Sequence, residues 1–278
     1  MTQLVSRLPA VVAIPTKNEA ENIASTVDAV AGHFEAVVVV DSGSTDDTCA
    51  IAVAHGAEVV PYTWDGGYPK KKQWCLENVY PDVPWLLFLD GDEVPTPELI
   101  AELREVFSRP VTAAAFDIPL LYWFAGRPLR RGHTVVKRSL LDRTRVSYPE
   151  VDDLAAPGMG EQEGHYQPTA KGPVGQLKGR IEHRDLDPVR TWFERHNRYS
   201  DWEAWLEHHP GAKEQVRGLK THQGRLFQKV PFKPLLFFGY TYVARRGFLD
   251  GRAGFDYALA LSFYRWQIGL KARERAPS

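Results

Sequence analysis

The sequence predicts an α/β fold in which a mainly parallel sheet is flanked by helices and followed by a helical extension at the C-terminus. Over residues 1–110, short apolar runs alternate with amphipathic segments, which is typical of βαβ units with right-handed crossovers. The chain has 278 residues and 44% hydrophobic content, enough to bury a large core. Ligands bind such sheets at the carboxyl ends of the strands. The polar clusters of this sequence follow those predicted ends.

Residues 1–110 form the first part of the chain and carry the alternation. The predicted strands are short apolar runs, and the predicted helices are amphipathic. We expect strands at residues 10–14, 36–40, 58–61 and 85–90. We expect helices at residues 19–33, 44–55 and 70–79.

The remainder of the chain is less regular and divides into two further parts. In residues 111–225 we expect strands at 114–122 and 135–141, a loop with Gly and Pro at 148–175, and a helix at 191–208. In residues 226–278 we expect helices at 233–246 and 255–271, joined by residues 247–254. Neither of the last two helices is both long and apolar enough to span a membrane.

The two cysteines and the N-terminal residues indicate the cellular compartment in which we expect the protein. Cys49 and Cys75 both lie in predicted helices and match no metal-ligand spacing, so we expect neither a disulfide framework nor a zinc site. Residues 1–10 lack an apolar signal segment, and no stretch approaches the roughly 20 uncharged residues of a spanning helix. We therefore expect a cytoplasmic protein.

The formal net charge of -1 hides an asymmetry between the third part and the rest of the chain. Residues 226–278 contain nine Lys and Arg against three acids, which is +6 and leaves -7 elsewhere. The same segment contains twelve aromatic residues. Apolar rings together with cations suit the anionic inner face of a membrane, so we expect a peripheral contact there. Nucleic acid is the rival partner for a basic segment, and we expect none to be bound.

The most informative local pattern is a group of three carboxylates at the end of the strand at 85–90. Asp90 and Asp92 are separated only by Gly91, and Glu93 follows. Both aspartates can therefore reach one hard divalent cation, Mn²⁺ or Mg²⁺, which usually shares its remaining positions with substrate phosphates. The alternative is an acidic turn in which Asp and Gly serve the backbone alone.

Polar residues also close the first two predicted strands. They are Pro15, Thr16, Lys17, Asn18 and Glu19 after the first, and Asp41, Ser42, Gly43, Ser44, Thr45 and Asp46 after the second. Such groups can hydrogen-bond a base and a ribose, although Ser44 or Thr45 can equally cap the next helix. Asp41 ends a run of four valines and is placed for ligand contact. The glycine loop before Lys70, Lys71 and Lys72 suits phosphates, with a solvated lysine run as the alternative.

Three of these segments resemble, in their order and spacing, the motif series of the family 2 inverting glycosyltransferases with the GT-A fold. They are residues 14–19, 40–48 and 89–93, and the match covers roughly residues 8–110. A Trp-x-Gly element followed by lysine, at residues 64–72, narrows the resemblance toward bacterial lipopolysaccharide-core and cell-envelope glycosyltransferases.

The resemblance implies a nucleotide-diphosphate sugar as donor and a set of donor-binding residues. They are Pro15, Thr16, Asn18, Glu19, Asp41, Ser42, Lys72, Asp90 and Gly91. The resemblance also makes Asp90 and Asp92 the metal-binding DxD pair for Mn²⁺ or Mg²⁺. One departure is Ser42, which stands where the usual Asp-Asp-Gly-Ser has its second acid.

Inverting transfer to a hydroxyl group also needs a base, and a carboxylate can serve. The irregular loop of the second part offers Glu150, Asp152, Asp153, Glu161 and Glu163. We choose Glu163 because the surrounding Gly-Glu-Gln-Glu-Gly-His-Tyr resembles the element that ends the acceptor loop in relatives. Asp152 and Asp153 are the other catalytic candidates. For each acid alone, surface solvation is the alternative.

Two histidines and one helix face complete the candidates. His165 and His183 could complete the metal shell or bind the acceptor, or be ordinary hydrogen-bonded histidines. Arg195, Arg198 and Trp202 share a helix face suited to sugars and phosphates, with a salt-bridged packing helix as the alternative.

We therefore expect an inverting, metal-dependent hexosyltransferase-type enzyme that acts on a hydroxyl of a cell-envelope or lipid-linked glycan, with residues 1–110 binding the donor and residues 111–225 the acceptor. A polyprenyl-phosphate glycosyltransferase is the alternative within the same fold. Two alternatives belong to other classes: a nucleotidyltransferase, and a non-catalytic module that binds membranes or carbohydrates. A homodimer is a further expectation.

Overall fold

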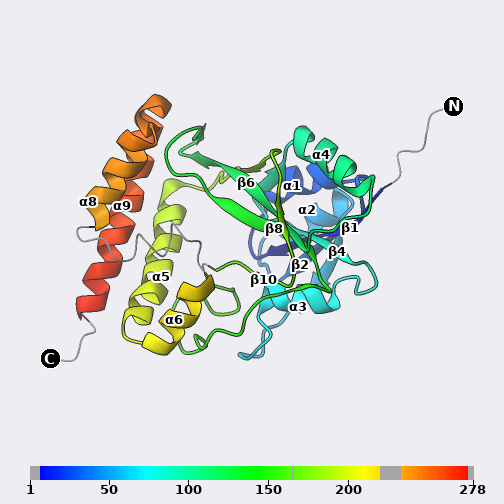
Figure 1. Cartoon of the computed structure of the whole chain (residues 1–278), viewed down its shortest axis with the longest axis horizontal. Helices are drawn as coiled ribbons and strands as arrows, with labels where there is room; N and C mark the ends of the chain where they lie inside the picture. The colour runs from blue at the N-terminus through cyan, green and yellow to red at the C-terminus, as the bar shows by residue number, and fades with distance from the viewer. Residues whose placement is uncertain (1–6, 165, 220–232, 275–278) are drawn as a thin grey trace.

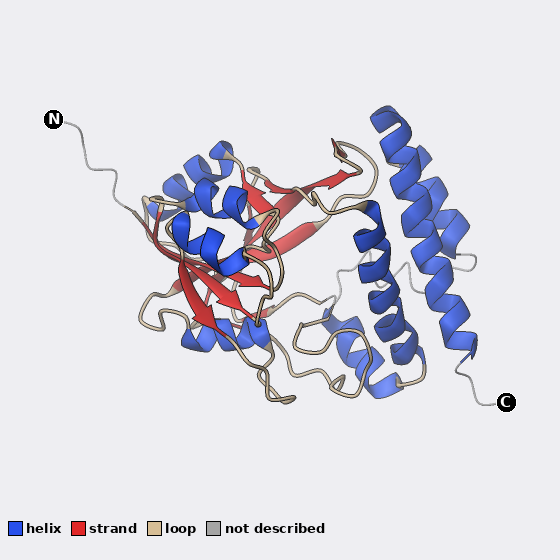
Figure 2. Ribbon diagram, turned by 180° about the vertical axis from the view of Figure 1, so that it is seen from behind, coloured by secondary structure: helices blue, strands red, loops and turns tan. Residues whose placement is uncertain are grey.

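The computed structural model describes residues 7–164, 166–219 and 233–274. A twisted sheet occupies one side of the molecule, with α1, α2 and α4 on one of its faces and α3 on the other (Figure 1). Helices α5, α8 and α9 stand beside the sheet as a separate layer, seen from behind in Figure 2. The expected α/β architecture with a C-terminal helical extension is confirmed.

The first part of the chain alternates strands and helices as expected. It contains β1 (Leu8–Thr16), α1 (Ile23–Val30), β2 (Phe34–Asp41), α2 (Thr48–Ala54), β3 (Glu58–Pro61), α3 (Lys71–Asn78), β4 (Trp85–Phe88), β5 (Glu93–Pro95) and α4 (Pro97–Phe107). Strands β3, β2, β1 and β4 are adjacent in that order and all parallel. Their carboxyl ends therefore meet at one edge of the sheet.

Most strands of the second part extend the same sheet with mixed pairing, and two short ones pair only with each other. It contains β6 (Ala115–Phe124), β7 (Arg127–Pro128), β8 (Val136–Asp142), β9 (Val146–Ser147), β10 (Thr169–Ala170), β11 (Val174–Gln176), β12 (Ile181–His183), α5 (Val189–Glu207) and α6 (Pro210–Leu219). Strand β8 pairs antiparallel with both β4 and β6. Strand β12 lies parallel to β6 and antiparallel to β5, which brings the chain back to the end of β4.

Both faces of the central strands are buried, as their continuous apolar sequence predicts. Val12, Ile14 and Val39 pack in the cluster that includes α1 and α4. Val11 and Val38 point to the opposite face, where the cluster includes residues of α3 and α5. The parallel strands are thus fixed in register by packing on both sides.

Several helix boundaries differ from expectation for local reasons. The helix expected at 19–33 begins at Ile23, since Asn18 has a φ of 57° and residues 17–22 form a turn. The helix expected at 44–55 begins at Thr48 for the same kind of reason, because the preceding residues form a loop. Helix α4 was not expected, although Thr96 caps it and Pro97 opens it, a recognisable start signal.

The third part is more helical than expected. It contains α8 (Lys233–Phe238), the π-helix η1 (Gly239–Ala244), the 3-10 helix η2 (Gly247–Asp250) and α9 (Gly251–Glu274). Residues 247–254, expected to join the two helices, are themselves helical, because η2 and the first turn of α9 occupy them. Among the described helices none combines the length and the apolar content needed to cross a membrane.

The contact between η2 and α9 depends on a glycine. A Cβ on Gly254 would lie 2.0 Å from the carbonyl oxygen of Gly247, so one backbone would have to move. Gly269 lies in the same helix, and a Cβ there would meet only the flexible end of Arg273, at 3.5 Å.

We predict that Gly254→Ala destabilises the protein by about 1–3 kcal/mol, the usual cost of overpacking. Gly269→Ala should be neutral or stabilising by up to about 1 kcal/mol, because alanine favours the helix. Urea unfolding of both variants measures the difference. Equal stability of the two variants would contradict the close packing of η2 on α9.

Candidate active site

The polar residues predicted to act on a ligand gather at the carboxyl edge of β1, β2 and β4. The loop after β4 is held there by two contacts within the edge. Glu93 Oε2 accepts a hydrogen bond from the backbone N–H of Asp90 at 2.8 Å. Thr26 Oγ1 donates to the carbonyl of Gly91 at 2.7 Å. A Cβ on Gly91 would lie 2.7 Å from Cγ of Glu19, so the tight approach of these two loops requires glycine.

The second aspartate of the pair belongs to a group of three metal-ligating side chains. Ligand atoms of Asp92, His183 and Asp185 lie within 4.8 Å of one another. His183 Nε2 lies 3.3 Å from Asp92 Oδ2. The antiparallel pairing of β12 with β5 produces this arrangement, since it sets His183 opposite Glu93.

This donor set fits a divalent cation. Two carboxylates and one imidazole are ligands that Mn²⁺ accepts readily, and carboxylates also suit Mg²⁺. The buried Nδ1 of His183 has no hydrogen-bond partner within the described chain, and it lies 3.7 Å from Glu93 Oε1. Glu93 is therefore placed to orient the imidazole.

The first aspartate of the pair lies with cations instead. Lys137 Nζ is 3.0 Å from Asp90 Oδ2 and 2.6 Å from Glu93 Oε2. Lys72 Nζ is 3.8 Å from Asp90 Oδ1. Burial alone would raise the pKa of Asp90, but Lys137 and Lys72 hold it below its usual value. The expected metal pair thus separates: Asp92 joins His183 and Asp185, and Asp90 faces two lysines.

Burial and mutual charge perturb the remaining acids of this edge. Burial raises the pKa of Asp92 to about 6, with Asp90 and Glu93 adding to the shift. Burial, followed by the charge of Asp92, raises the pKa of Glu19 to about 8. Burial would lower the pKa of His183, yet the neighbouring carboxylates outweigh it and raise that pKa to about 9. Such perturbation is common where charged groups are concentrated for function.

The loops after β1 and β2 are tied to each other. The backbone N–H of Asn18 donates to Ser44 Oγ at 2.8 Å, and Asn18 Oδ1 accepts from the N–H of Thr45 at 2.8 Å. Asp41 Oδ2 accepts from the N–H groups of Gly43 and Ser44 at 2.9 and 2.8 Å. Asn18 and Asp41 therefore shape the loops themselves. Ser44 and Thr45 lie before α2 and do not cap it with their side chains.

Lys71 rather than Lys72 lies between the ends of β1 and β2. Its Nζ donates to the carbonyl of Thr16 at 2.9 Å and to Ser42 Oγ at 2.5 Å. Ser42 in turn donates to Glu161 of the irregular loop. The side-chain hydroxyl of Thr16 is buried on backbone carbonyls, and Pro15 precedes it in β1.

The side chain of Glu163, the preferred base, lies against the N-terminus of α3. Its two carboxylate oxygens accept the backbone N–H groups of Lys72 and Gln73 at 3.1 and 3.0 Å. Burial raises the pKa of Glu163, while Lys72 and the helix amides oppose the rise. The carboxylate thus satisfies amides that a helix start leaves open.

The other two catalytic candidates occupy contrasting positions. Asp153 is buried and accepts hydrogen bonds from Lys70 Nζ at 2.8 Å, Tyr68 Oη at 3.2 Å and Trp202 Nε1 at 3.0 Å. Both of its oxygens are engaged in these bonds, one of them with the ammonium of Lys70. A catalytic role for Asp153 stays a prediction. Asp152 is exposed.

Helix α5 contributes to the same edge. Arg195 pairs with Asp185 and, at 3.2 Å, with Asp187, so it orients a member of the metal-ligating group. Trp202 packs in the core below, and Arg198 is exposed. His165 lies outside the described residues.

Sequence reasoning missed Lys137, Asp185 and Glu93 as site residues. The only signal for Asp185 was its spacing, because His183 and Asp185 are two residues apart, as Asp90 and Asp92 are. Lys137 carried no such signal, since its place depends on the pairing of β8 with β4.

A family model described as glycosyl transferase family 2 matches residues 11–157, which is more than half of the chain. The chain belongs to this family, which favours sugar transfer over the nucleotidyltransferase and non-catalytic alternatives. Its mixed sheet flanked by helices is of the GT-A type, as the resemblance implied.

Three relatives illustrate the range of similarity. An uncharacterized glycosyltransferase of Rickettsia felis is 41% identical over 95 residues, 34% of this chain and 32% of that protein. The chain thus spans about a third of the length of that relative. The lipopolysaccharide core biosynthesis glycosyltransferase LpsC of Rhizobium meliloti is 26% identical over 98% of this chain and 94% of LpsC. The structure of glucosyl-3-phosphoglycerate synthase from Mycobacterium tuberculosis aligns with a TM-score of 0.38 at 17% identity, covering 71% of this chain and 78% of that one.

We predict that Asp153→Asn destabilises the protein by about 3–5 kcal/mol, because it leaves the buried ammonium of Lys70 without its counter-charge. Asp152→Asn is the matched control and should change stability by less than about 0.5 kcal/mol. Denaturant unfolding measures both. A fully stable Asp153→Asn protein that has lost transfer would make Asp153 a catalytic residue and not a structural one.

Proposed function

We propose that this enzyme transfers a sugar, with inversion, from a nucleotide-diphosphate donor to a hydroxyl group of a cell-envelope or lipid-linked glycan. The observation that carries the proposal is the Asp92, His183 and Asp185 group beside Lys72 and Lys137 at the carboxyl edge of the sheet. The similarity to LpsC over nearly the whole of both chains supports an envelope glycan as acceptor.

Asp92, His183 and Asp185 would hold the cation, Mn²⁺ or Mg²⁺. When bound, it supplies Lewis-acid stabilisation of the departing diphosphate. Lys72 and Lys137 add positive charge at the same place, since both approach Asp90. Arg195 positions Asp185 by its ion pair, and Glu93 positions the ring of His183.

The donor nucleotide is proposed to lie over the ends of β1 and β2. Pro15, Thr16, Glu19, Asp41 and Ser42 line this edge. Lys71 extends the set, because it joins both strand ends through Thr16 and Ser42. Gly91 allows the close approach of the acidic loop to Glu19.

In the proposed reaction the acceptor oxygen attacks the anomeric carbon while the bond from that carbon to the diphosphate oxygen breaks. The hydroxyl proton passes to a carboxylate, for which Glu163 is our candidate, and the nucleotide diphosphate leaves. Burial raises the pKa of Glu163, which favours its acceptance of a proton. To act as base, the carboxylate must exchange at least one of its α3 amides for the acceptor hydroxyl.

We predict that UDP-, GDP- or dTDP-sugars raise the melting temperature of the protein in the presence of Mn²⁺, since a ligand that binds the native state stabilises it. Asp92→Asn should remove the Mn²⁺-dependent part of this shift and lower transfer by at least about 100-fold, because the amide keeps the shape but loses the charge that holds the cation. Asp90→Asn should also lower transfer.

Asp82→Asn is the matched control for Asp92→Asn, because Asp82 is exposed just before β4, at the opposite end of that strand. It should behave as the unmodified protein. Product analysis with hydroxyl and polyprenyl-phosphate acceptors separates the two family alternatives. A folded Asp92→Asn protein with normal metal-dependent transfer would end the assignment of the metal site.

We further predict that Glu163→Gln lowers turnover by at least about 100-fold with little change in donor affinity, the effect expected for loss of a general base. The glutamine can still accept one helix amide through its carbonyl oxygen, so the fold should persist. Steady-state kinetics and a melting curve measure the two properties. A loss of stability and donor binding without a specific loss of turnover would make Glu163 a helix cap only.

A further inference from the structure

The C-terminal elements carry most of the exposed large hydrophobic side chains of the described chain. Six of them belong to α8, η1 and η2: Leu235, Leu236, Tyr240, Val243, Phe248 and Leu249. Exposed apolar residues on a monomer are normally scattered singly, and a concentration of them marks an interaction surface. The proposed reaction makes no use of these residues.

Helix α9 adds a regular apolar stripe to this surface. Phe255, Leu259, Phe263, Trp266 and Leu270 are 39 to 51% exposed. They follow one another at three or four residues, which places them within about 80° on the helix and along about 22 Å of its length. We call these five residues the outer stripe.

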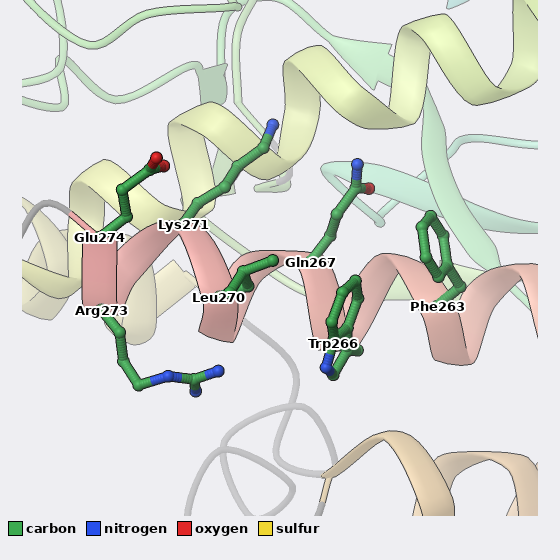
Figure 3. Close-up of a pocket in the computed structure, with 7 residues that line it drawn as sticks. All are labelled: Phe263, Trp266, Gln267, Leu270, Lys271, Arg273 and Glu274. Carbon is green, nitrogen blue, oxygen red and sulfur yellow. The ribbon is translucent and has the colours of Figure 1, made fainter.

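The outer stripe lies opposite the packed face of α9. Tyr257, Leu261 and Tyr264 are buried on that packed face. Gln267 and Lys271 bond to Asn197 of α5 and extend toward that helix in Figure 3. The outer stripe is therefore turned away from the body, and part of it lines an open hollow of about 540 Å³.

Basic residues stand at both ends of the outer stripe. Arg252 precedes it with a side chain that is 92% exposed, and Arg273 follows it in the same sector of the helix. Figure 3 shows Arg273 leaving α9 on the side away from Lys271. Two acids lie near these arginines: Asp256 is 3.6 Å from Arg252 and paired with it, and Glu274 follows Arg273 and lines the same hollow.

We propose that the outer stripe and the adjoining apolar residues of α8, η1 and η2 dock in the plane of an anionic lipid bilayer. Aromatic and aliphatic side chains suit the boundary between headgroups and acyl chains, and the flanking arginines suit anionic headgroups. Phe255 contacts the rings of Phe238 and Tyr242, so the apolar surface continues beyond one helix.

A second copy of the chain fits this surface less well. Two helices that pair as a coiled coil bury a narrow apolar stripe of two residues per heptad. The apolar surface here is wider, because it includes residues of α8, η1 and η2 as well as α9. Pairing two outer stripes would also bring the exposed side chains of Arg252 and Arg273 from the two copies near one another. An anionic surface neutralises the arginines in one step.

The test is co-sedimentation of the full chain with vesicles, without donor or metal, so that the result is independent of the proposed reaction. We expect binding to vesicles of phosphatidylcholine with about 30% phosphatidylglycerol, weak binding to phosphatidylcholine alone, and release by salt. Phe263→Glu with Trp266→Glu should weaken binding at least tenfold. Arg252→Gln with Arg273→Gln should reduce the preference for the anionic vesicles.

Val53→Glu is the matched control, because Val53 is 59% exposed on α2, outside this surface. It should bind vesicles as the unmodified chain does. Circular dichroism confirms that each variant is folded. Absence of vesicle binding, binding that survives the stripe variants, or a stripe-dependent dimer in light scattering without vesicle binding would each overturn the proposal.

Discussion

The candidate site lies at the carboxyl edge of β1, β2 and β4, which we call the active edge. It depends on positive charges that compensate its buried carboxylates. Asp92 and Glu93 are nearly inaccessible, and an uncompensated charge in such a place costs several kcal/mol. Lys137 of β8 and His183 of β12 supply the compensation. Because these two side chains come from different strands, the order of the mixed sheet is what allows the acids to remain charged at the end of β4. Sheet topology and site electrostatics are thus one constraint.

Helix α5 connects this edge to the C-terminal elements. One side of it faces the site, where Arg195 pairs with Asp185 and Trp202 donates to Asp153. The other side packs on α9, where Asn197 accepts a hydrogen bond from Lys271 and the ring of Trp192 lies against that of Tyr257. Helix α5 therefore lies between the candidate site and α9, and α9 presents the outer stripe on the side away from α5.

The sequence was sufficient for the parallel strands and for the polar loops at their ends, because hydrophobic runs and strand-end residues are local properties. It was insufficient wherever strand pairing decided the outcome. The run at 181–183 is too short to be recognised as a strand, yet its pairing with β5 puts His183 beside Asp92. The choice of Lys72 over Lys71 for the nucleotide edge depended on the rotation of α3, which sequence spacing does not give. The engagement of Asp153 with Lys70 was likewise invisible, since these residues are 83 positions apart.

For the proposed reaction, the charge balance of the edge gives a reason for a cation and a donor to bind together. Glu19, Asp90, Asp92, Glu93 and Asp185 gather there, and Lys137 and Lys72 already approach Asp90, with Lys137 also paired to Glu93. An incoming diphosphate would therefore meet no excess of positive charge from the protein alone. A divalent cation held by Asp92, His183 and Asp185 would reverse this balance where the diphosphate must lie. It would also let Asp90 yield its two lysines to the phosphates, so donor affinity should depend on the cation more than on any single side chain.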